Sequence, residues 1–215
     1  PLDLPLIAQN FDRFLVGVRV TLGLTFLSLA LGAALAVPLA IARASRHRVL
    51  NPLVWTYTYV FRGTPLLVQT YLLYYGAGQF AFIRDSWLWD PVLSQAWWCA
   101  LIAFTLNTAA YSTELLRGAI VDTPAGEVEA AIATGHSYCG RLRRIILPSA
   151  FRRAIPAYSN EVIFMLHGSV VASTITLQDI LGVGRWLNGR YYLAYEGLIT
   201  AAVLYFIIVF AITRV

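Results

Sequence analysis

Lysine is missing from this sequence: all 16 basic residues in the 215-residue chain are arginines. A phosphate-binding loop of the Walker type needs a lysine that reaches the nucleotide phosphates. The chain therefore cannot be a Walker-type ATPase.

Charge is scarce as well. Charged residues make up 13% of the chain, whereas soluble domains contain about 25%. With 59% hydrophobic residues and a mean hydropathy of +0.66, the composition is that of a membrane protein. The net charge of +5 is typical of arginines gathered on the inner side of a membrane, and we do not expect nucleic-acid binding.

Cysteine is nearly absent, with only Cys99 and Cys139 present. The two segments that contain them are expected at opposite faces of the membrane, so we expect neither a disulfide nor a metal site. The chain begins at Pro1 instead of methionine and ends at Val215 within an apolar run. We therefore expect it to be a piece of a longer protein.

Long apolar runs dominate the chain and predict membrane-spanning helices, each near the roughly 20 residues that cross the hydrocarbon core. The predicted spans cover about 20–42, 52–83, 97–119, 156–175 and 196–213, with a long loop at 120–155. Glycine and alanine are frequent within them, which suits close helix packing in lipid. We predict an all-α membrane protein with five transmembrane helices in a single domain over residues 1–215.

The arginines predict the orientation of the chain, because arginine is enriched in cytoplasmic loops. Eight arginines lie in the loops at 43–51 and 120–155, and three lie in the loops at 84–96 and 177–195. The eight are Arg43, Arg46, Arg48, Arg141, Arg143, Arg144, Arg152 and Arg153. The first two loops are therefore predicted to be cytoplasmic, with the N-terminus outside and the C-terminus inside.

The loop at 120–155 carries a long polar segment, GEVEAAIATGHSYCGRLRRIILPSA, at residues 126–150. Its first half has good helix propensity, and Glu127 and Glu129 would lie in the first turn, where negative charge suits the helix dipole. Gly135 is predicted to end this helix. A basic helix lying on anionic lipid would account for the arginines. A docking helix for a cytoplasmic partner would account for the small, acidic first half as well.

Within this loop, EAAIATGHSYCGRLRRIILP resembles the EAA motif of ATP-binding-cassette importer permeases: Glu129, Ala130 and Ala131, then Gly135, then Leu-Pro at 147–148. Three further stretches are similar to the polar amino acid branch of that family, and most similar to its HisM-type histidine/lysine/arginine/ornithine permease subunits. They are FRGTPLLVQTYLLYYG (61–76), TLNTAAYSTELLRGAI (105–120) and PAYSNEVIFMLH (156–167). The resemblance covers nearly the whole chain from Leu15.

The resemblance implies the type I importer (MetI-like) permease fold in the bacterial inner membrane, for a chain that is not an enzyme. It implies that the loop is a coupling helix in a groove of the ATPase, with Glu129, Ala130, Ala131 and Gly135 as the coupling residues. The implied partners are a second permease subunit, expected to be a paralogue, two cytoplasmic ATPase subunits and a periplasmic amino acid-binding protein. No cofactor is expected in this chain, since ATP and magnesium would be bound by the ATPase.

Several polar residues lie inside the predicted spans, where an ionisable group costs about 2.5–3.5 kcal/mol and normally faces protein or water. Asn107 and Glu114 are seven residues apart on the third span, and Asn160 and His167 are seven apart on the fourth, so each pair shares a helix face. Glu161 adjoins Asn160. Carboxylates and amides near a translocation path would suit a cationic amino acid. Alternatively, these groups join helices to one another.

Two of the charged residues have specific alternative interpretations. Glu114 can pair with Arg117 near the cytoplasmic end of its span. Arg62 precedes a glycine and a proline that are expected to kink or start the second span. It can act as a gate or as the pairing partner of Glu161, or it can extend to the inner membrane surface as an ordinary interfacial arginine.

The predicted function is ATP-driven import of basic or polar amino acids (arginine, histidine, lysine, ornithine) from the periplasm to the cytoplasm. An ion-driven secondary transporter is one alternative, but such folds are usually built from paired repeats, and the sequence shows none. A non-transporting membrane scaffold is the other alternative. It would leave Glu114 and Glu161 without an explanation.

Overall fold

The computed structural model describes residues 3–45, 47–193 and 195–214, and within these ranges the chain is helical with no strand. The prediction of an all-α protein is confirmed for these residues, while Arg46, one of the arginines counted above, lies outside them. The described chain divides into two compact units, one from residues of 1–28, 66–104 and 163–215 and the other from 29–65 and 105–162. Three long helices contribute to both units: α2 (Phe11–Ala44), α6 (Ala96–Val121) and α9 (Leu147–Gly168).

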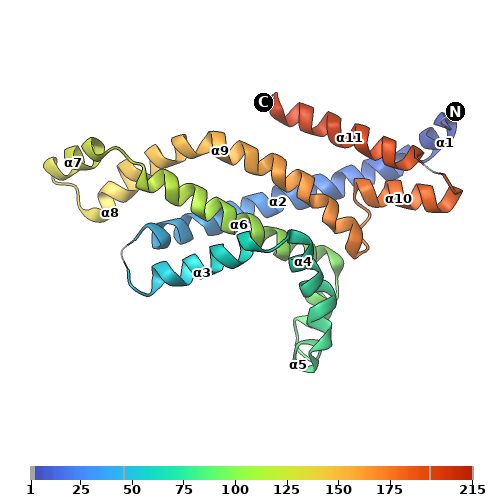
Figure 1. Ribbon diagram of the computed structural model, residues 1–215, viewed down its shortest axis with the longest axis horizontal. Coiled ribbons are helices and arrows are strands. Elements are labelled where there is room, and N and C mark those ends of the chain that lie inside the picture. Colours follow the sequence, from blue (N-terminus) through green and yellow to red (C-terminus); the bar gives the residue numbers. More distant parts are fainter. Residues whose placement is uncertain (1–2, 46, 194, 215) are drawn as a thin grey trace. The chain divides into compact units, whose positions relative to one another are not determined.

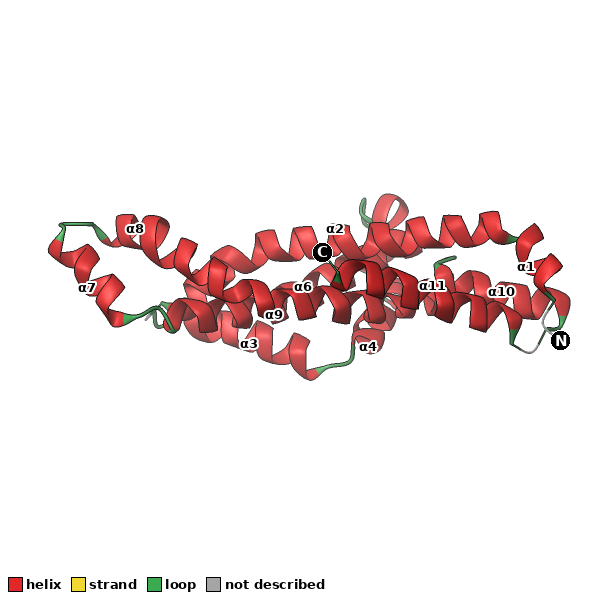
Figure 2. Ribbon diagram, turned by 90° about the horizontal axis from the view of Figure 1, so that it is seen from above, coloured by secondary structure: helices red, strands yellow, loops and turns green. Residues whose placement is uncertain are grey.

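The first unit is built around its C-terminal helices. It contains α1 (Leu4–Gln9), α4 (Leu66–Tyr71), α5 (Ala81–Arg84), α10 (Ile180–Tyr191) and α11 (Glu196–Thr213), with π or 3-10 turns at Leu72–Gly76, Ala77–Gln79, Trp89–Leu93 and Ser169–Ile175. α11 lies beside α10 (Figure 1, Figure 2). Phe14, Ile180, Val183, Leu187 and Ala201 form the buried apolar core of this unit.

α10 and α11 contact each other closely at two glycines. A Cβ atom on Gly197 would lie 2.2 Å from the carbonyl oxygen of Gly184 and 2.5 Å from Asn188 Oδ1. Small residues permit this approach of helix backbones in membrane proteins. The contact therefore depends on the absence of a side chain at both glycines.

Gly197→Ala is expected to destabilise the protein by about 1–3 kcal/mol, because the new methyl group has to push the two helices apart. Thermal unfolding of the purified protein in detergent measures this as a lower midpoint temperature. Gly189→Ala in α10 is the control, since a Cβ atom there meets nothing within 4 Å. Equal midpoints for the two variants would contradict the close packing.

The second unit contains α3 (Leu50–Gly63), α7 (Ala125–Ala133), α8 (Tyr138–Arg141) and a π turn at Leu142–Ile146, with parts of α2, α6 and α9. Its buried apolar cluster consists of Ala40, Leu116, Ala150 and Ala154, which join α2, α6 and α9. A Cβ atom on Gly32 of α2 would lie 2.4 Å from Thr108 Cγ2 of α6. Small residues thus let the helices of this unit pack closely.

The helices differ from the predicted spans at several places. α2 begins at Phe11 instead of 20, and the α-helix at the fourth predicted span ends at Gly168, with a 3-10 turn up to Ile175. α3 ends at Gly63 and α4 begins only at Leu66, so 52–83 is not one helix. Thr64 is extended because Pro65 disfavours the helical conformation in the residue before it. The expected kink at the glycine and proline is confirmed. The helix at the fourth predicted span begins at Leu147 instead of 156, so the end of the predicted loop is helical.

Membrane-spanning helices are identified by length and composition. Among the described residues, α2 and α11 are long and apolar enough to cross a membrane, and Tyr138–Ile175 with α10 adds a third if that bent pair is one span. α11 has the bounds that were predicted for the fifth span. The count of five spans stays a prediction.

Candidate functional site

A buried carboxylate lies where α9 contacts α6. Glu161 of α9 is 9% exposed, and one carboxylate oxygen accepts a hydrogen bond from Thr108 Oγ1 at 2.8 Å. Arg62 of α3 is near enough to act on this carboxylate electrostatically, but Glu161 forms no ion pair with any described residue. Because an ionised carboxylate can accept about four hydrogen bonds, Glu161 keeps most of its acceptor capacity.

The C-terminal end of α3 lies beside the same part of α6. Asn107 Nδ2 donates to the Phe61 carbonyl at 3.3 Å, and the Tyr111 hydroxyl donates to the Arg62 carbonyl at 3.2 Å. The guanidinium of Arg62 lies 5.3 Å from the centre of the Tyr111 ring. Two side chains of α6 thus supply donors to carbonyls that have no partner inside α3.

The electrostatics of this cluster favour a positive charge. The C-terminal end of a helix carries a partial negative charge, and Glu161 adds a full charge on the neighbouring helix. Broken helices whose ends face a ligand are typical of binding sites inside transporters. The Arg62 guanidinium is the one positive group of the cluster, and it can bind a ligand carboxylate or neutralise Glu161 itself.

The predicted site residues do not all belong to this cluster. Glu161, Asn107 and Arg62 are the predicted residues that the structure gathers around the end of α3. Asn160 and His167 are both exposed, and His167 belongs to the other compact unit.

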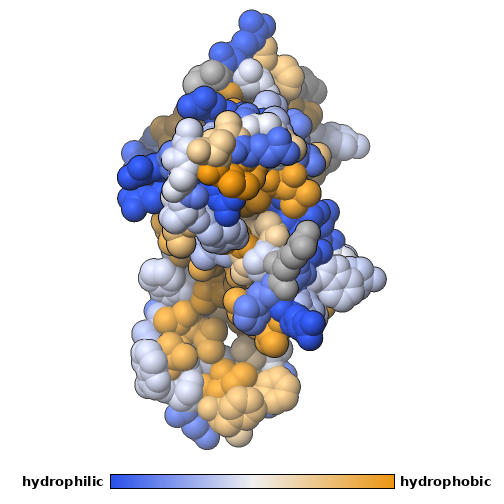
Figure 3. All heavy atoms as spheres, turned by 90° about the vertical axis from the view of Figure 1, so that its left-hand side faces the viewer, coloured by the Kyte–Doolittle hydropathy of each residue, from blue (hydrophilic) through white to orange (hydrophobic). Residues whose placement is uncertain are grey.

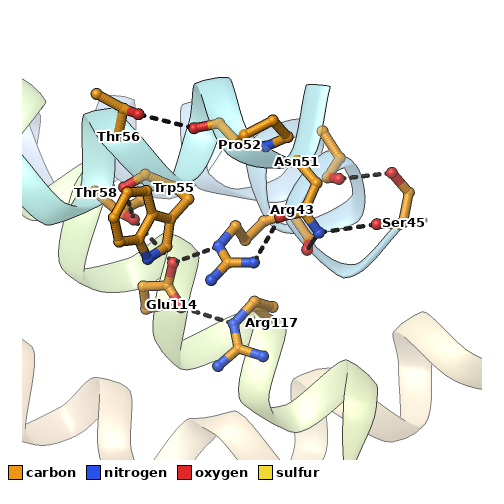
Figure 4. Close-up of polar contacts among 10 residues, drawn as sticks. Arg43, Ser45, Asn51, Pro52, Trp55, Thr56, Thr58, Glu114 and Arg117 are labelled. Carbon is orange, nitrogen blue, oxygen red and sulfur yellow. Dashed lines mark hydrogen bonds and ion pairs between the residues drawn. The ribbon is translucent and has the colours of Figure 1, made fainter. Parts of the chain in front are cut away.

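Glu114 of α6 belongs to a different cluster, in which both of its carboxylate oxygens are bound (Figure 4). Oε1 accepts from Arg43 Nε at 3.0 Å and from Thr58 Oγ1 at 2.8 Å, and Oε2 accepts from Arg117 Nε at 2.6 Å. Arg43 also donates to Asn51 Oδ1 at 2.8 Å, and Asn51 donates back to the Arg43 carbonyl at 2.7 Å. The pairing with Arg117, which was the alternative interpretation of Glu114, is present, and the carboxylate joins α2, α3 and α6.

The predicted coupling loop begins with α7, which ends at a glycine. Gly135 has a φ of 76°, a conformation that glycine adopts without steric cost. Its N–H donates to the Ile132 carbonyl at 2.9 Å, and the N–H of His136 donates to the Ala131 carbonyl at 3.0 Å. This pair of bonds is a Schellman cap, and the prediction that Gly135 ends the helix is confirmed.

The predicted coupling residues differ in exposure. Glu129 and Ala130 are exposed, whereas Ala131 is 2% exposed where α7 packs against the following segment at 138–146. A groove of about 890 Å³ beside the cap is lined in part by Gly135 and Arg144. Figure 3 views the molecule from this end, where hydrophilic residues surround small hydrophobic patches. Glu129 and Ala130 are therefore available to a partner, and Ala131 holds the loop together.

Several polar residues of these clusters were not predicted, among them Thr108, Arg43, Asn51 and Thr58. A threonine within a span is usually a packing residue, and an arginine at a span end is usually a solvated charge. Arg43 and Glu114 are 71 positions apart, and no pattern in a single sequence connects residues at that separation.

Comparisons with known proteins agree with one another. Residues 20–215 match the family described as binding-protein-dependent transport system inner membrane component. The octopine transport system permease protein OccM of Rhizobium radiobacter is 43% identical over 100% of the chain and 87% of its own length. The histidine/lysine/arginine/ornithine transport system permease protein HisM of Escherichia coli K12 is 44% identical over 95% of the chain and 85% of its own length. A solved structure described as an amino acid ABC transporter with histidines superimposes with a TM-score of 0.88 at 28% identity, covering 100% of the chain and 95% of its own chain.

Proposed function

The chain belongs to the family of binding-protein-dependent transport system inner membrane components, and we propose that within this family it carries cationic amino acids into the cytoplasm. Its relatives are permease proteins of transport systems. The chain is accordingly a permease subunit of an ATP-binding-cassette importer in the bacterial inner membrane, and not an enzyme. The similarity to the solved amino acid transporter supports the importer-permease fold.

The proposal that the substrate is cationic rests on the difference between the carboxylates of Glu114 and Glu161. Glu114 is bound by two arginines, so it has no oxygen without a cationic partner. Glu161 is buried and accepts one hydrogen bond, from Thr108. Because a buried carboxylate is costly unless it is paired, Glu161 is suited to bind the cationic group of a passing substrate.

The remaining polar residues receive roles around this carboxylate. We assign Asn107 and Arg62 to the same site. Arg62 is proposed to bind the carboxylate of the substrate at one stage and to neutralise Glu161 at another. Asn160 and His167, which are exposed, are assigned to the path on the surface of α9. Glu114 is assigned to holding helices together and not to substrate.

The named cargoes of the relatives support a substrate that carries a cationic group. OccM is named for octopine, and HisM for histidine, lysine, arginine and ornithine. Octopine and arginine each carry a guanidinium, and lysine and ornithine each carry an ammonium group. A carboxylate can bind either group with charge-assisted hydrogen bonds.

The proposed assembly contains two permease subunits, of which the second is a paralogue, two cytoplasmic ATPase subunits and a periplasmic binding protein. ATP and magnesium are bound by the ATPase subunits, which agrees with the missing lysine. The arginine count supports an external N-terminus, a cytoplasmic C-terminus and a cytoplasmic loop at 120–155, with five spans in a single permease domain.

The proposed mechanism is alternating access driven from the loop. The ATPase subunits bind the exposed face of α7 at Glu129, Ala130 and Gly135. The buried Ala131 packs α7 against the segment at 138–146. Closure of the ATPase pair displaces α7 and moves the helices that follow. The site around Glu161 then opens to each side of the membrane in turn.

Uptake by proteoliposomes tests the cargo. The chain is reconstituted with its co-purified partners, and the import of labelled arginine, histidine, glutamine and glutamate is compared with ATP enclosed. Import confined to arginine and histidine is the expected result, because the site holds an acceptor for a cation. Import of glutamine or glutamate instead would leave the family assignment intact and overturn the proposed cargo.

A further inference from the structure

Arg153 of α9 closes the base of the loop that carries α7. One terminal nitrogen, Nη2, donates to the Ala119 carbonyl and to Thr123 Oγ1, both at 2.8 Å, and Nη1 donates to Ser149 Oγ. Ala119 lies in the last turn of α6, where carbonyls have no partner inside the helix. A single guanidinium of α9 thus joins the end of α6 to the start of the loop.

The backbone on both sides of this joint is stiff. Only Pro124 separates Thr123 from the first residue of α7, and its ring fixes φ, which is −53° here. On the other side, the chain is helical without interruption from Tyr138 to Gly168. α7 packs directly against the start of this helical run, at 138–146. A displacement of α7 is therefore expected to act on both α6 and α9.

Packing holds the guanidinium at the end of α6. Ala150 and Ala154 of α9 are buried in one cluster with Leu116 of α6, and Ala119 packs against that cluster. These small side chains bring the two helices close together. Arg153 can therefore reach the Ala119 carbonyl across the contact.

We propose that Arg153 is a positioning residue that makes α6 and α9 move together when a cytoplasmic partner displaces α7. This inference rests on the proposed function of the loop. The two helices also carry the two halves of the buried hydrogen bond, Thr108 on α6 and Glu161 on α9. If α6 and α9 move together, Thr108 and Glu161 stay hydrogen-bonded while the site opens to one side of the membrane or the other. If the two helices move separately, ATP is hydrolysed without transport of substrate.

The test compares ATP hydrolysis with arginine import in proteoliposomes that contain the complete complex. In Arg153→Gln, the number of ATP molecules hydrolysed per arginine imported is expected to rise about tenfold, because hydrogen bonds from a charged donor are lost. Arg152→Gln is the matched control, since Arg152 is the neighbouring residue, has the same charge and is also exposed. It is expected to keep the wild-type ratio.

A second variant separates coupling from folding. Thr123→Val removes one acceptor of Arg153 and should raise the ratio by less than Arg153→Gln does. The double variant should not exceed Arg153→Gln, because both changes act on the same joint. If the complex with Arg153→Gln does not assemble, the proposal is tested by the number of ATP molecules that Thr123→Val hydrolyses per arginine imported. A wild-type value for Thr123→Val then overturns the proposal.

The possible outcomes distinguish a failure of the role proposed for Arg153 from a failure of the proposed function on which it rests. An unchanged ratio in Arg153→Gln, or an equal rise in Arg152→Gln, overturns the role of Arg153 while the importer stands. Wild-type protein that hydrolyses ATP without importing arginine overturns the proposed function instead.

Discussion

Glu129→Arg is expected to abolish uptake while the complex remains assembled. Glu129 is exposed on α7, beside the exposed Ala130, on the face that we assign to the ATPase. Reversing its charge places a mismatched group in that interface, where the cost is about 2–5 kcal/mol. Since each 1.4 kcal/mol is about tenfold in an equilibrium constant, uptake should fall roughly 30-fold to more than 1,000-fold. Uptake of labelled arginine, with co-purification of the partner chains, measures both parts of the prediction.

Asp85→Arg provides the control for this experiment. Asp85 is exposed, lies between α5 and α6 and undergoes the same change of charge. It is expected to retain most of the uptake, because it lies outside the helix that we assign to the contact with the ATPase. Normal uptake by Glu129→Arg, or an equal loss in the two variants, would contradict the assignment of α7 as the coupling element.

Glu161→Gln is expected to have the second large effect, on the substrate itself. Removing one partner of a buried charge pair costs about 2–5 kcal/mol. Import of arginine should therefore fall roughly 30-fold to more than 1,000-fold. The amide is nearly the same size as the carboxylate, and it still accepts the hydrogen bond from Thr108. The loss should thus follow the charge and not the packing.

Two further variants make this result specific. Glu161→Asp keeps the charge and should recover part of the import. Glu114→Gln removes a carboxylate that already binds Arg43 and Arg117, so it should lower the midpoint of thermal unfolding without changing which amino acids are imported. Wild-type import of arginine by Glu161→Gln would refute the site, and so would a change of substrate preference in Glu114→Gln.

The parts of this structure that the sequence predicts well are those governed by local chemistry. Apolar runs predict an all-α membrane protein, and the last of them coincides with α11. Gly135 predicts the end of α7, because its positive φ favours glycine. Pro65 predicts the break between α3 and α4, because proline disfavours the helical conformation in the residue before it.

The bounds of the longer helices were less predictable. α9 begins at Leu147, nine residues before the predicted span, and its first turns pack against α2 and α6 through Ala150 and Ala154. Hydropathy reports where a helix enters lipid and not where it starts. The apolar pattern alone therefore left 147–155 in the loop.

Three residues of the candidate site, Glu161, Asn107 and Arg62, were predicted from the sequence, but their arrangement was not. Seven-residue spacing placed Asn107 and Glu114 on one face of α6, yet Asn107 bonds to Phe61 of α3 and Glu114 bonds to Arg43 of α2. Which neighbour a polar side chain meets depends on how helices from distant parts of the chain pack. Spacing along a single helix does not contain that information.

The central claim is that ATP hydrolysis on partner chains drives import through α7. The most direct test is uptake of labelled arginine into proteoliposomes that contain the assembled complex, with ATP enclosed and without it. The account predicts that arginine accumulates only when ATP is present on the side of the membrane that bears α7. Accumulation that is the same with and without ATP would mean that the loop does not couple this chain to an ATPase.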